Sequence, residues 1–395
     1  MSTSEQALAD ASDPKHRNLL FLLFAGFVLS GIATTIVGPM LPLFIKRWSL
    51  DDGQAGLFSL IQFLAALAGT LASSVIASWG GYRPALVLGY ALMGGGLAGL
   101  NAGTHLVALE ATAAFGLGYG LITPGTNLFV AELGGAKRAS LLNLLNFTWG
   151  LGAMACSPLI AFALKHNCLA QLLVGFAIFG GLLVLGLLVT PLGEEHHQAN
   201  TRTAGATQPR IGPAITIALA ALFFIYVATE NGIGIWAAEY AKRLANGITA
   251  MTTLAPMFFY AGLTLGRASA PLVLRRVSER KIVLAALGLT AAGITLLIAS
   301  TTLKSALPAA FLAGLGCASV YPIYIAWFSH WYGARAKKVG GLLFALASLG
   351  GSAGPGAVGF ISKLSGSLRV GMLAPLVATL IMFTLVLLLR KQTTA

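Results

Sequence analysis

The sequence contains very few charged residues for its length. Only 9% of its 395 residues are Asp, Glu, Lys or Arg, whereas 57% are hydrophobic. A water-soluble protein of this size would need many more charged and polar side chains to cover its surface. The scarcity of charge therefore excludes a soluble globular fold and predicts a membrane protein.

Acidic residues are fewer than basic ones: the sequence has 12 Asp and Glu and 25 Lys and Arg, which gives a formal net charge of +13. A basic balance can indicate nucleic-acid binding. Here, however, the basic residues fall in short segments between apolar runs, and no aromatic residues are interleaved with them. We therefore expect no nucleic-acid partner and attribute the positive charge to membrane topology.

Cysteine is also rare, and the signatures of enzymes are missing. The three cysteines, Cys156, Cys168 and Cys317, lie in or beside apolar segments without metal-ligand or redox spacing, so we expect them to pack. The sequence shows neither a nucleophile with a nearby base nor a phosphate-binding glycine loop. We expect no enzymatic activity, no metal site and no cofactor.

Long apolar runs are what the sequence has in abundance. Each is long enough to cross about 30 Å of hydrocarbon as a helix. Helices are favoured because backbone polar groups must be satisfied within the segment, and no alternating pattern of a β-barrel is present. We predict an all-α membrane protein of twelve transmembrane helices in two pseudo-symmetric six-helix bundles. The predicted spans are 19–45, 55–78, 84–102, 105–132, 139–164, 169–190, 213–241, 250–274, 281–301, 304–331, 336–361 and 370–390.

The Lys and Arg residues predict the orientation. Sixteen of the 25 fall on the side of the membrane that holds both termini, and eight fall on the other side. Positively charged loops stay in the cytoplasm, so both termini should be cytoplasmic in the inner (plasma) membrane. The first eighteen residues are polar and lack the features of a signal peptide, so we expect the first span to remain in the mature protein.

The longest polar stretch, residues 191–212, divides the chain into two halves that resemble each other. Gly116-Leu117-Gly118 matches Gly314-Leu315-Gly316 at an offset of 198, and Arg83 matches Arg280 at 197. A duplicated six-helix unit is typical of transporters whose site lies at the repeat interface near the midplane. We predict a cytoplasmic tail, a bundle, a cytoplasmic linker, a second bundle and a second tail, at 1–18, 19–190, 191–212, 213–390 and 391–395.

One acidic residue, Glu230, falls at mid-depth in a predicted span. A charged side chain there costs roughly 2.5–3.5 kcal/mol on insertion scales, so it usually faces a bundle interior or a wet cavity. Helical spacing places Tyr226, Ile233, Ala237 and Tyr240 on the same face. A carboxyl in such surroundings can exchange a proton as they change, so Glu230 is our candidate proton-coupling residue. The alternative is a structural acid paired with a neighbour.

Arg267 is the only Lys or Arg that falls away from the ends of the predicted spans, roughly 6 Å to the cytoplasmic side of the middle by helical rise. Two interpretations are open. Arg267 can pair with Glu230 or bind an anionic group, or it can close a cytoplasmic gate with helix-end carbonyls or with Glu132.

Amide and aromatic side chains in the spans are candidates for solute binding, because amides both donate and accept hydrogen bonds and aromatic rings can stack on a sugar. Hydrogen bonding between helices and anchoring at the membrane interface are the structural alternatives. The candidates are Tyr226, Asn231, Trp236, Asn127, Asn143, Asn146, Trp149, Tyr324 and Trp327.

Over its whole length the chain resembles the major facilitator superfamily. The loop at 74–83 keeps Gly81 and Arg83 of the superfamily's signature, with Ser78 in place of its aspartate. The run Tyr226-x-x-x-Glu230-x-x-x-Gly234-x-Trp236-x-x-x-Tyr240 resembles the branch of fucose- and glucose-type symporters, as do the stretches 124–132 and 143–147. Several sugar symporters of that branch carry an acid in the first helix.

In this chain the first helix offers only hydroxyls, including Thr34, the repeat partner of Glu230 at an offset of 196. We nevertheless predict a monomeric secondary transporter that moves a small polar solute, a sugar, across the lipid bilayer with protons by alternating access. The coupling ion is expected to be H⁺, with Na⁺ as the alternative. A proton-coupled exporter of drugs or metabolites, a uniporter and a non-transporting receptor are the other hypotheses.

Overall fold

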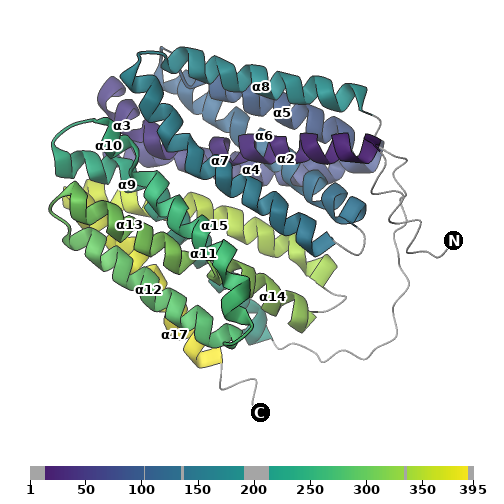
Figure 1. Cartoon of the computed structure of the whole chain (residues 1–395). Helices are drawn as coiled ribbons and strands as arrows, with labels where there is room; N and C mark the ends of the chain where they lie inside the picture. The colour runs from purple at the N-terminus through teal and green to yellow at the C-terminus, as the bar shows by residue number, and fades with distance from the viewer. Residues whose placement is uncertain (1–13, 102, 135–137, 191–212, 333–335, 390–395) are drawn as a thin grey trace. The chain divides into compact units, whose positions relative to one another are not determined.

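In the computed structural model, the described residues are 14–101, 103–134, 138–190, 213–332 and 336–389, and they contain helices and no strand (Figure 1). Among them, ten helical segments are long and apolar enough to cross a membrane. The chain is therefore a multi-pass membrane protein. The twelve-span count and the division into two six-helix bundles stay predictions.

Every predicted span is occupied by one helix or by two consecutive helices. In the first half these are α2 (Pro14–Thr35), α3 (Val37–Trp48), α4 (Asp52–Gly80), α5 (Tyr82–Gly99), α6 (His105–Gly134), α7 (Arg138–Lys165) and α8 (Leu169–Val189). In the second half they are α9 (Pro213–Ala245), α10 (Ala250–Thr253), α11 (Ala255–Leu274), α12 (Glu279–Ala299), α13 (Leu303–Cys317), α14 (Val320–Tyr332), α15 (Ala336–Ser365), α16 (Leu368–Gly371) and α17 (Leu373–Leu389).

A proline follows each of the four places where one predicted span is divided into two helices. The first helix of each pair ends three to five residues before a proline, and these prolines are Pro39, Pro256, Pro322 and Pro375. A proline has no N–H for the carbonyl four residues earlier, and its ring crowds that carbonyl. The helical hydrogen bonding is therefore interrupted just before each proline.

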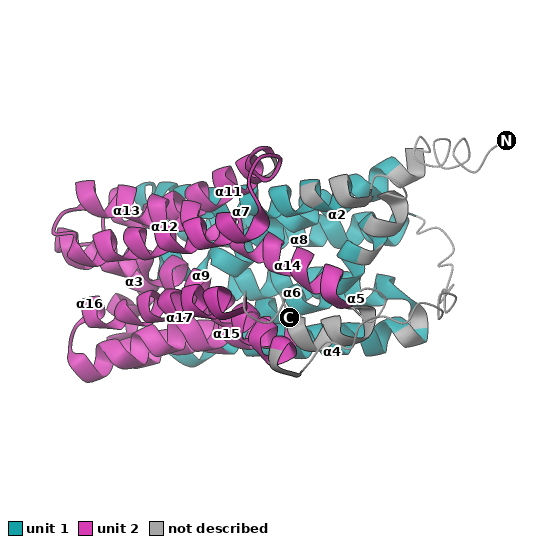
Figure 2. Cartoon of the chain, turned by 90° about the horizontal axis from the view of Figure 1, so that it is seen from below, with its two compact units in different colours: residues 1–40, 61–195 teal, residues 41–60, 196–395 magenta. Residues whose placement is uncertain are grey.

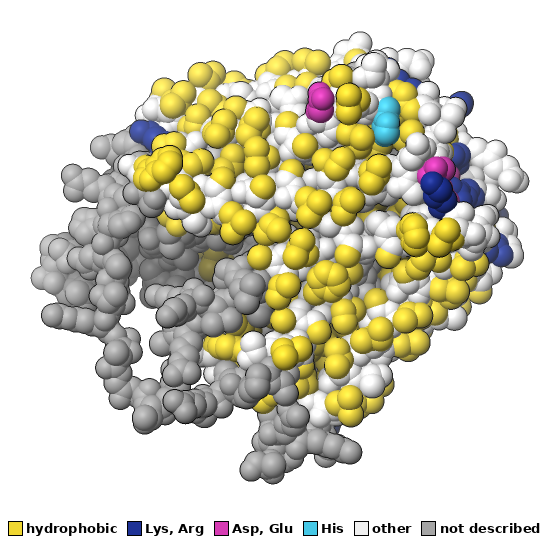
Figure 3. Space-filling view, turned by 180° about the vertical axis from the view of Figure 1, so that it is seen from behind, with side chains coloured by type: hydrophobic (Ala, Val, Ile, Leu, Met, Phe, Trp, Pro, Cys, Tyr) yellow, Lys and Arg dark blue, Asp and Glu magenta, His cyan; other side chains and the backbone are white. Residues whose placement is uncertain are grey.

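Side chains on the outer faces of the helices are those expected of a lipid-facing protein. In α8, Val174, Ile178, Leu182 and Leu185 are each more than half exposed, whereas Leu183 on another face is 2% exposed. The face shown in Figure 3 is covered largely by hydrophobic side chains, with few charged ones. Exposed apolar surface on this scale is stable only against lipid.

Contacts divide the chain into two compact units, coloured in Figure 2. Unit 1 comprises residues 1–40 and 61–195, and unit 2 comprises residues 41–60 and 196–395. Most of α3 and the first turns of α4 therefore belong with the second half of the chain. The predicted linker 191–212, the tail 391–395 and most of the tail 1–18 lie outside the described residues.

The sequence repeat is visible in how helices pack inside each unit. Gly152 of α7 lies against the carbonyl of Val28 in α2, and Gly350 of α15 lies against the carbonyl of Phe224 in α9. Each residue of the second pair follows its counterpart at the offset of 196 to 198 found in the sequence. A side chain larger than hydrogen at either glycine would strike the neighbouring backbone, so both units use glycine for the same close helix contact.

Arg83 and Arg280, predicted as repeat partners, also occupy equivalent places. Arg83 Nε donates to Leu187 O at 3.0 Å, at the C-terminal end of α8. Arg280 Nη2 donates to Val386 O at 3.2 Å, near the end of α17. A cation at a helix C-terminus satisfies carbonyls that have no partner within the helix and opposes the negative end of its dipole. Each arginine therefore fixes the last helix of its half.

Candidate functional site

Glu230 lies in α9 of unit 2 and is 8% exposed. Its nearest basic partner is Arg267 of α11, whose Nη2 is 3.6 Å from Glu230 Oε2. This contact fits the pairing with Glu230, while the gate with Glu132 involves a side chain outside the described ones, so the role of Arg267 stays a prediction. An arginine and a carboxylate in contact compensate each other's charge, which lowers the cost of placing both inside a membrane.

The face of α9 that carries Glu230 is buried along its length. Tyr226, Ile233, Ala237 and Tyr240 are each 3% exposed or less. Tyr226 Oη donates to Cys317 O at 3.1 Å, at the end of α13. Tyr240 Oη donates to Leu297 O at 3.0 Å, in α12. The predicted face therefore points into the protein interior, and its two tyrosines tie α9 to neighbouring helices.

Two aromatic rings of α14 lie beside Tyr226. The ring centroid of Tyr226 lies 5.5 Å from that of Tyr321 and 6.4 Å from that of Tyr324, and the Tyr324 centroid lies 5.7 Å from that of Trp327. Among the described residues the buried Tyr324 hydroxyl has no hydrogen-bond partner. The structure thus brings together three predicted residues and Tyr321. Tyr321 was missed, although its position three residues before Tyr324 places both on one face.

Unit 1 contains a second polar cluster, centred on Thr34. Trp149 Nε1 of α7 donates to Thr34 Oγ1 at 3.1 Å. Gln62 Nε2 of α4 donates to Thr34 O at 3.0 Å. The other amide atom, Gln62 Oε1, is buried without a hydrogen-bond partner in the described part of the chain. Sequence analysis missed Gln62, although an uncharged amide inside a long apolar run is itself a signal.

The other predicted residues are more dispersed. The amides of Asn127, Asn146 and Asn231 each donate to the carbonyl four residues earlier in their own helix, at 2.8, 2.8 and 3.0 Å. Asn146 is exposed. Trp236 is fully buried, and its Nε1 donates to Pro355 O at 2.9 Å.

The side chains of Asn143 and Glu132 lie outside those that the structure describes. Within the described residues, no group of three or more His, Cys, Asp and Glu side chains could hold a metal ion. The roles assigned to the predicted residues stay predictions.

Solved structures share this fold. The Escherichia coli fucose:proton symporter FucP superposes with a TM-score of 0.62 at 16% identity, covering 95% of this chain and 99% of the other. A D-xylose-proton symporter gives 0.74 at 14% identity, covering 92% and 96%. The nucleoside transporter NupG gives 0.72 at 13% identity, covering 94% and 99%.

Sequence comparisons identify the family. An uncharacterized MFS-type transporter from Yersinia pestis is 24% identical over 365 residues, covering 89% of this chain and 91% of the relative. The model of the Major Facilitator Superfamily matches residues 23–302, which is most of the chain. This chain therefore belongs to the Major Facilitator Superfamily of membrane transporters.

Proposed function

We propose that this transporter imports a small polar solute, a sugar, together with protons, and that Glu230 carries the proton. The observation that carries the proposal is the contact between Glu230 and Arg267 inside unit 2. An ion pair within a membrane span is costly to maintain and is therefore a mark of function. The fold is shared with a fucose:proton symporter and a D-xylose-proton symporter, which agrees with this class of solute.

The pair gives a direct way to couple proton binding to a change of structure. Arginine stays charged in proteins, so proton exchange falls on the carboxyl of Glu230. When Glu230 binds a proton, Arg267 loses the negative charge that compensates its own. The change of charge beside Arg267 alters which acceptors its guanidinium favours, so that helix-end carbonyls or the solute can take the place of Glu230. Proton binding on α9 is therefore linked to movement of a side chain on α11.

The two polar clusters supply groups suited to a sugar. In unit 2 these are the Tyr324 hydroxyl, which has no hydrogen-bond partner among the described residues, and the rings of Tyr324 and Trp327. In unit 1 they are the Gln62 Oε1 atom, likewise without a partner in the part of the chain that the structure describes, and the indole of Trp149. A sugar offers hydroxyls for the polar atoms and an apolar ring face for the aromatic rings.

We further propose that the protein works as a monomer in the inner membrane, with twelve spans and both termini in the cytoplasm. The support is the unequal distribution of Lys and Arg, sixteen of which fall on the side of the termini. Thr34 at the position related to Glu230 leaves Glu230 without an acidic counterpart in the first half. We therefore expect one proton-carrying site rather than two.

The test is uptake of labelled fucose, xylose and nucleosides into proteoliposomes under an imposed pH gradient. Glu230→Gln should abolish pH-driven accumulation and retain exchange of solute at equal concentrations on both sides. Glu110→Gln, the same change at an exposed acid, is the matched control and should behave like the unmodified protein. Undiminished pH-driven accumulation by Glu230→Gln would rule out its role. Uptake of nucleosides alone would replace the sugar assignment.

A further inference from the structure

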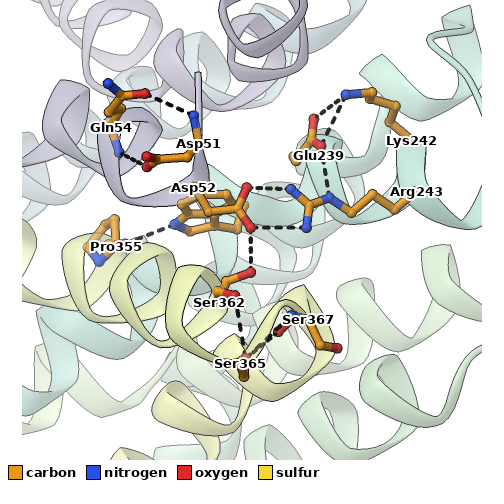
Figure 4. Close-up of polar contacts among 11 residues, drawn as sticks. Asp51, Asp52, Gln54, Glu239, Lys242, Arg243, Pro355, Ser362, Ser365 and Ser367 are labelled. Atoms are coloured by element: carbon orange, nitrogen blue, oxygen red, sulfur yellow. Dashed lines mark hydrogen bonds and ion pairs between the residues drawn. The ribbon is translucent and has the colours of Figure 1, made fainter. Parts of the chain in front are cut away.

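The C-terminal end of α9 carries a cluster of charged side chains that the proposed proton site does not use (Figure 4). Glu239, whose side chain is 1% exposed, accepts hydrogen bonds from two basic residues of the same helix. Lys242 Nζ lies 3.1 Å from Glu239 Oε2, and Arg243 Nε lies 2.9 Å from Glu239 Oε1. These contacts join positions three and four residues apart, so they persist wherever α9 moves.

The same arginine binds a second carboxylate from a distant part of the sequence. Arg243 Nη1 donates to Asp52 Oδ2 at 3.0 Å, and Arg243 Nη2 binds Asp52 Oδ1, across a separation of 191 residues. The Ser362 hydroxyl of α15 also donates to Asp52 Oδ2. Asp52, the first residue of α4, is therefore held by α9 and α15 at once, as Figure 4 shows. The bidentate contact with the guanidinium of Arg243 fixes the orientation of the Asp52 carboxylate.

The backbones of α4 and α15 pack closely beside this cluster, and glycine permits the contact. A side chain at Gly359 of α15 would strike the carbonyl oxygen of Asp52. One turn along α4, an added Cβ at Gly56 would lie 3.5 Å from the Cα of Gly356. The start of α4 therefore lies directly on α15 within unit 2.

Helix α4 is divided between the two compact units. Residues 41–60 belong to unit 2, whereas the rest of α4, from residue 61, belongs to unit 1. If the two units move during transport, the start of α4 must either leave α9 and α15 or separate from the remainder of its own helix. The contacts of Asp52 favour keeping the start of α4 on α9 and α15.

We propose that Asp52, Arg243, Glu239 and Ser362 form a latch that holds residues 41–60 on α9 and α15 in one state of the transport cycle and releases them in the other. The inference rests on the proposed alternating access. Glu239 is the permanent partner that keeps Arg243 oriented and compensated while the latch is open. Asp52 is the partner that leaves.

The charges make the latch reversible. Closed, the cluster contains two carboxylates, one ammonium group and one guanidinium group and is formally neutral. Open, Glu239 still neutralises part of the charge on α9, and Asp52, which is 12% exposed when the latch is closed, becomes hydrated. Since no charge is left buried alone, neither state carries the penalty of an unpaired buried ion.

A neighbouring ion pair supplies a matched control. Asp51 Oδ2 lies 3.1 Å from Lys363 Nζ, but these side chains are 42% and 51% exposed. The backbone N–H of Gln54, followed by Lys363, lowers the pKa of Asp51. Exposed pairs contribute little to stability because water and salt screen them. Asp51→Asn changes the same charge one residue away and should leave the latch closed.

Thiol labelling tests the latch without any solute. Gly56 is buried, so a cysteine there, in a background without Cys156, Cys168 and Cys317, should react slowly with a water-soluble maleimide. Adding Asp52→Asn should speed labelling by about tenfold or more, because charge-assisted hydrogen bonds are lost. Adding Asp51→Asn should leave the rate unchanged. Equal rates in the Asp52→Asn and Asp51→Asn proteins would overturn the proposal.

A reversible crosslink tests the role in transport. An added Cβ at Gly56 would lie 3.5 Å from the Cα of Gly356, so a cysteine at Gly56 is paired with a second cysteine at Gly356, and formation of the crosslink on oxidation is verified by mass spectrometry. The oxidised double variant in proteoliposomes should lose solute uptake, and a reductant should restore it, whereas the Gly56→Cys single variant should be insensitive. Full uptake by the crosslinked protein would overturn the latch and leave the transport function intact. Absence of uptake in the unmodified protein would instead overturn the proposed function.

Discussion

The indole N–H of Trp149 donates a hydrogen bond of 3.1 Å to the hydroxyl of Thr34, which occupies the position related by the repeat to Glu230. The first half of the chain thus keeps a polar contact where the second half keeps an ion pair. Thr34 also donates to its own helix, to the carbonyl of Ser30 at 2.8 Å. A single hydroxyl therefore connects α2 and α7 and holds the Trp149 ring in place.

Replacing Thr34 with valine should weaken solute binding. The change keeps the shape of the side chain and removes the hydrogen bond from the part-buried Trp149 N–H to Thr34, at a cost of about 0.5–1.5 kcal/mol. We expect a several-fold rise in KM for uptake, with Thr34→Ser close to the unmodified protein. Thr295→Val, which removes a hydroxyl on an exposed face, is the control. An unchanged KM in Thr34→Val would contradict a role of Trp149 in solute binding.

Phenylalanine substitutions at Tyr324 and Tyr226 should distinguish an effect on solute binding from an effect on stability. Tyr324→Phe removes a hydroxyl that has no partner among the described residues, so thermal stability should be unchanged or slightly higher. Tyr226→Phe removes the hydrogen bond to Cys317 O and should cost about 0.5–1.5 kcal/mol. Thermal unfolding and solute-induced thermal shift together separate the two. If Tyr324 binds solute, its variant loses the solute-induced shift while its own Tm is retained.

The arginine caps should matter equally in both halves. Arg83→Met and Arg280→Met each remove hydrogen bonds to helix-end carbonyls, and we expect each to cost about 1–2 kcal/mol in the free energy of unfolding. Arg275→Met, at an exposed arginine, is the control. Denaturant unfolding in detergent measures the differences. A decrease in the free energy of unfolding in only one of the two variants would show that the two arginines do not stabilise their halves equally.

Gly152 and Gly350 should tolerate no larger residue. Leucine at either position would strike a backbone carbonyl of the helix packed against it, so little folded protein should be recovered. Gly175→Leu is the matched control, because a Cβ there meets no atom within 4 Å. Size-exclusion profiles of the purified variants report the outcome. Well-folded Gly152→Leu and Gly350→Leu proteins would contradict the close contact.

The helices could be read from the sequence because an apolar run of sufficient length has few alternatives in a membrane. Their interruptions required more detail. The span 304–331 was predicted as one helix, but α13 and α14 divide it before Pro322. A proline follows each such division and leaves a carbonyl without a donor, and hydropathy alone does not report it.

The candidate site was predictable only in part. Helical rise gives the depth of Arg267 but not the face it occupies, so its contact with Glu230 appeared only in the structure. Asp52 and Glu239 were missed for a different reason. Both lie near the ends of spans, where charged residues are common and ordinarily hydrated. Only the approach of residues 191 positions apart shows that Asp52 and Arg243 belong together.

The central claim is that one proton moves with each solute and that Glu230 carries it. The direct measurement is the pH change inside proteoliposomes when solute enters in the absence of an imposed gradient. The unmodified protein should acidify the interior in proportion to solute uptake, and Glu230→Gln should exchange solute without moving protons. Acidification by Glu230→Gln equal to that of the unmodified protein would contradict the account.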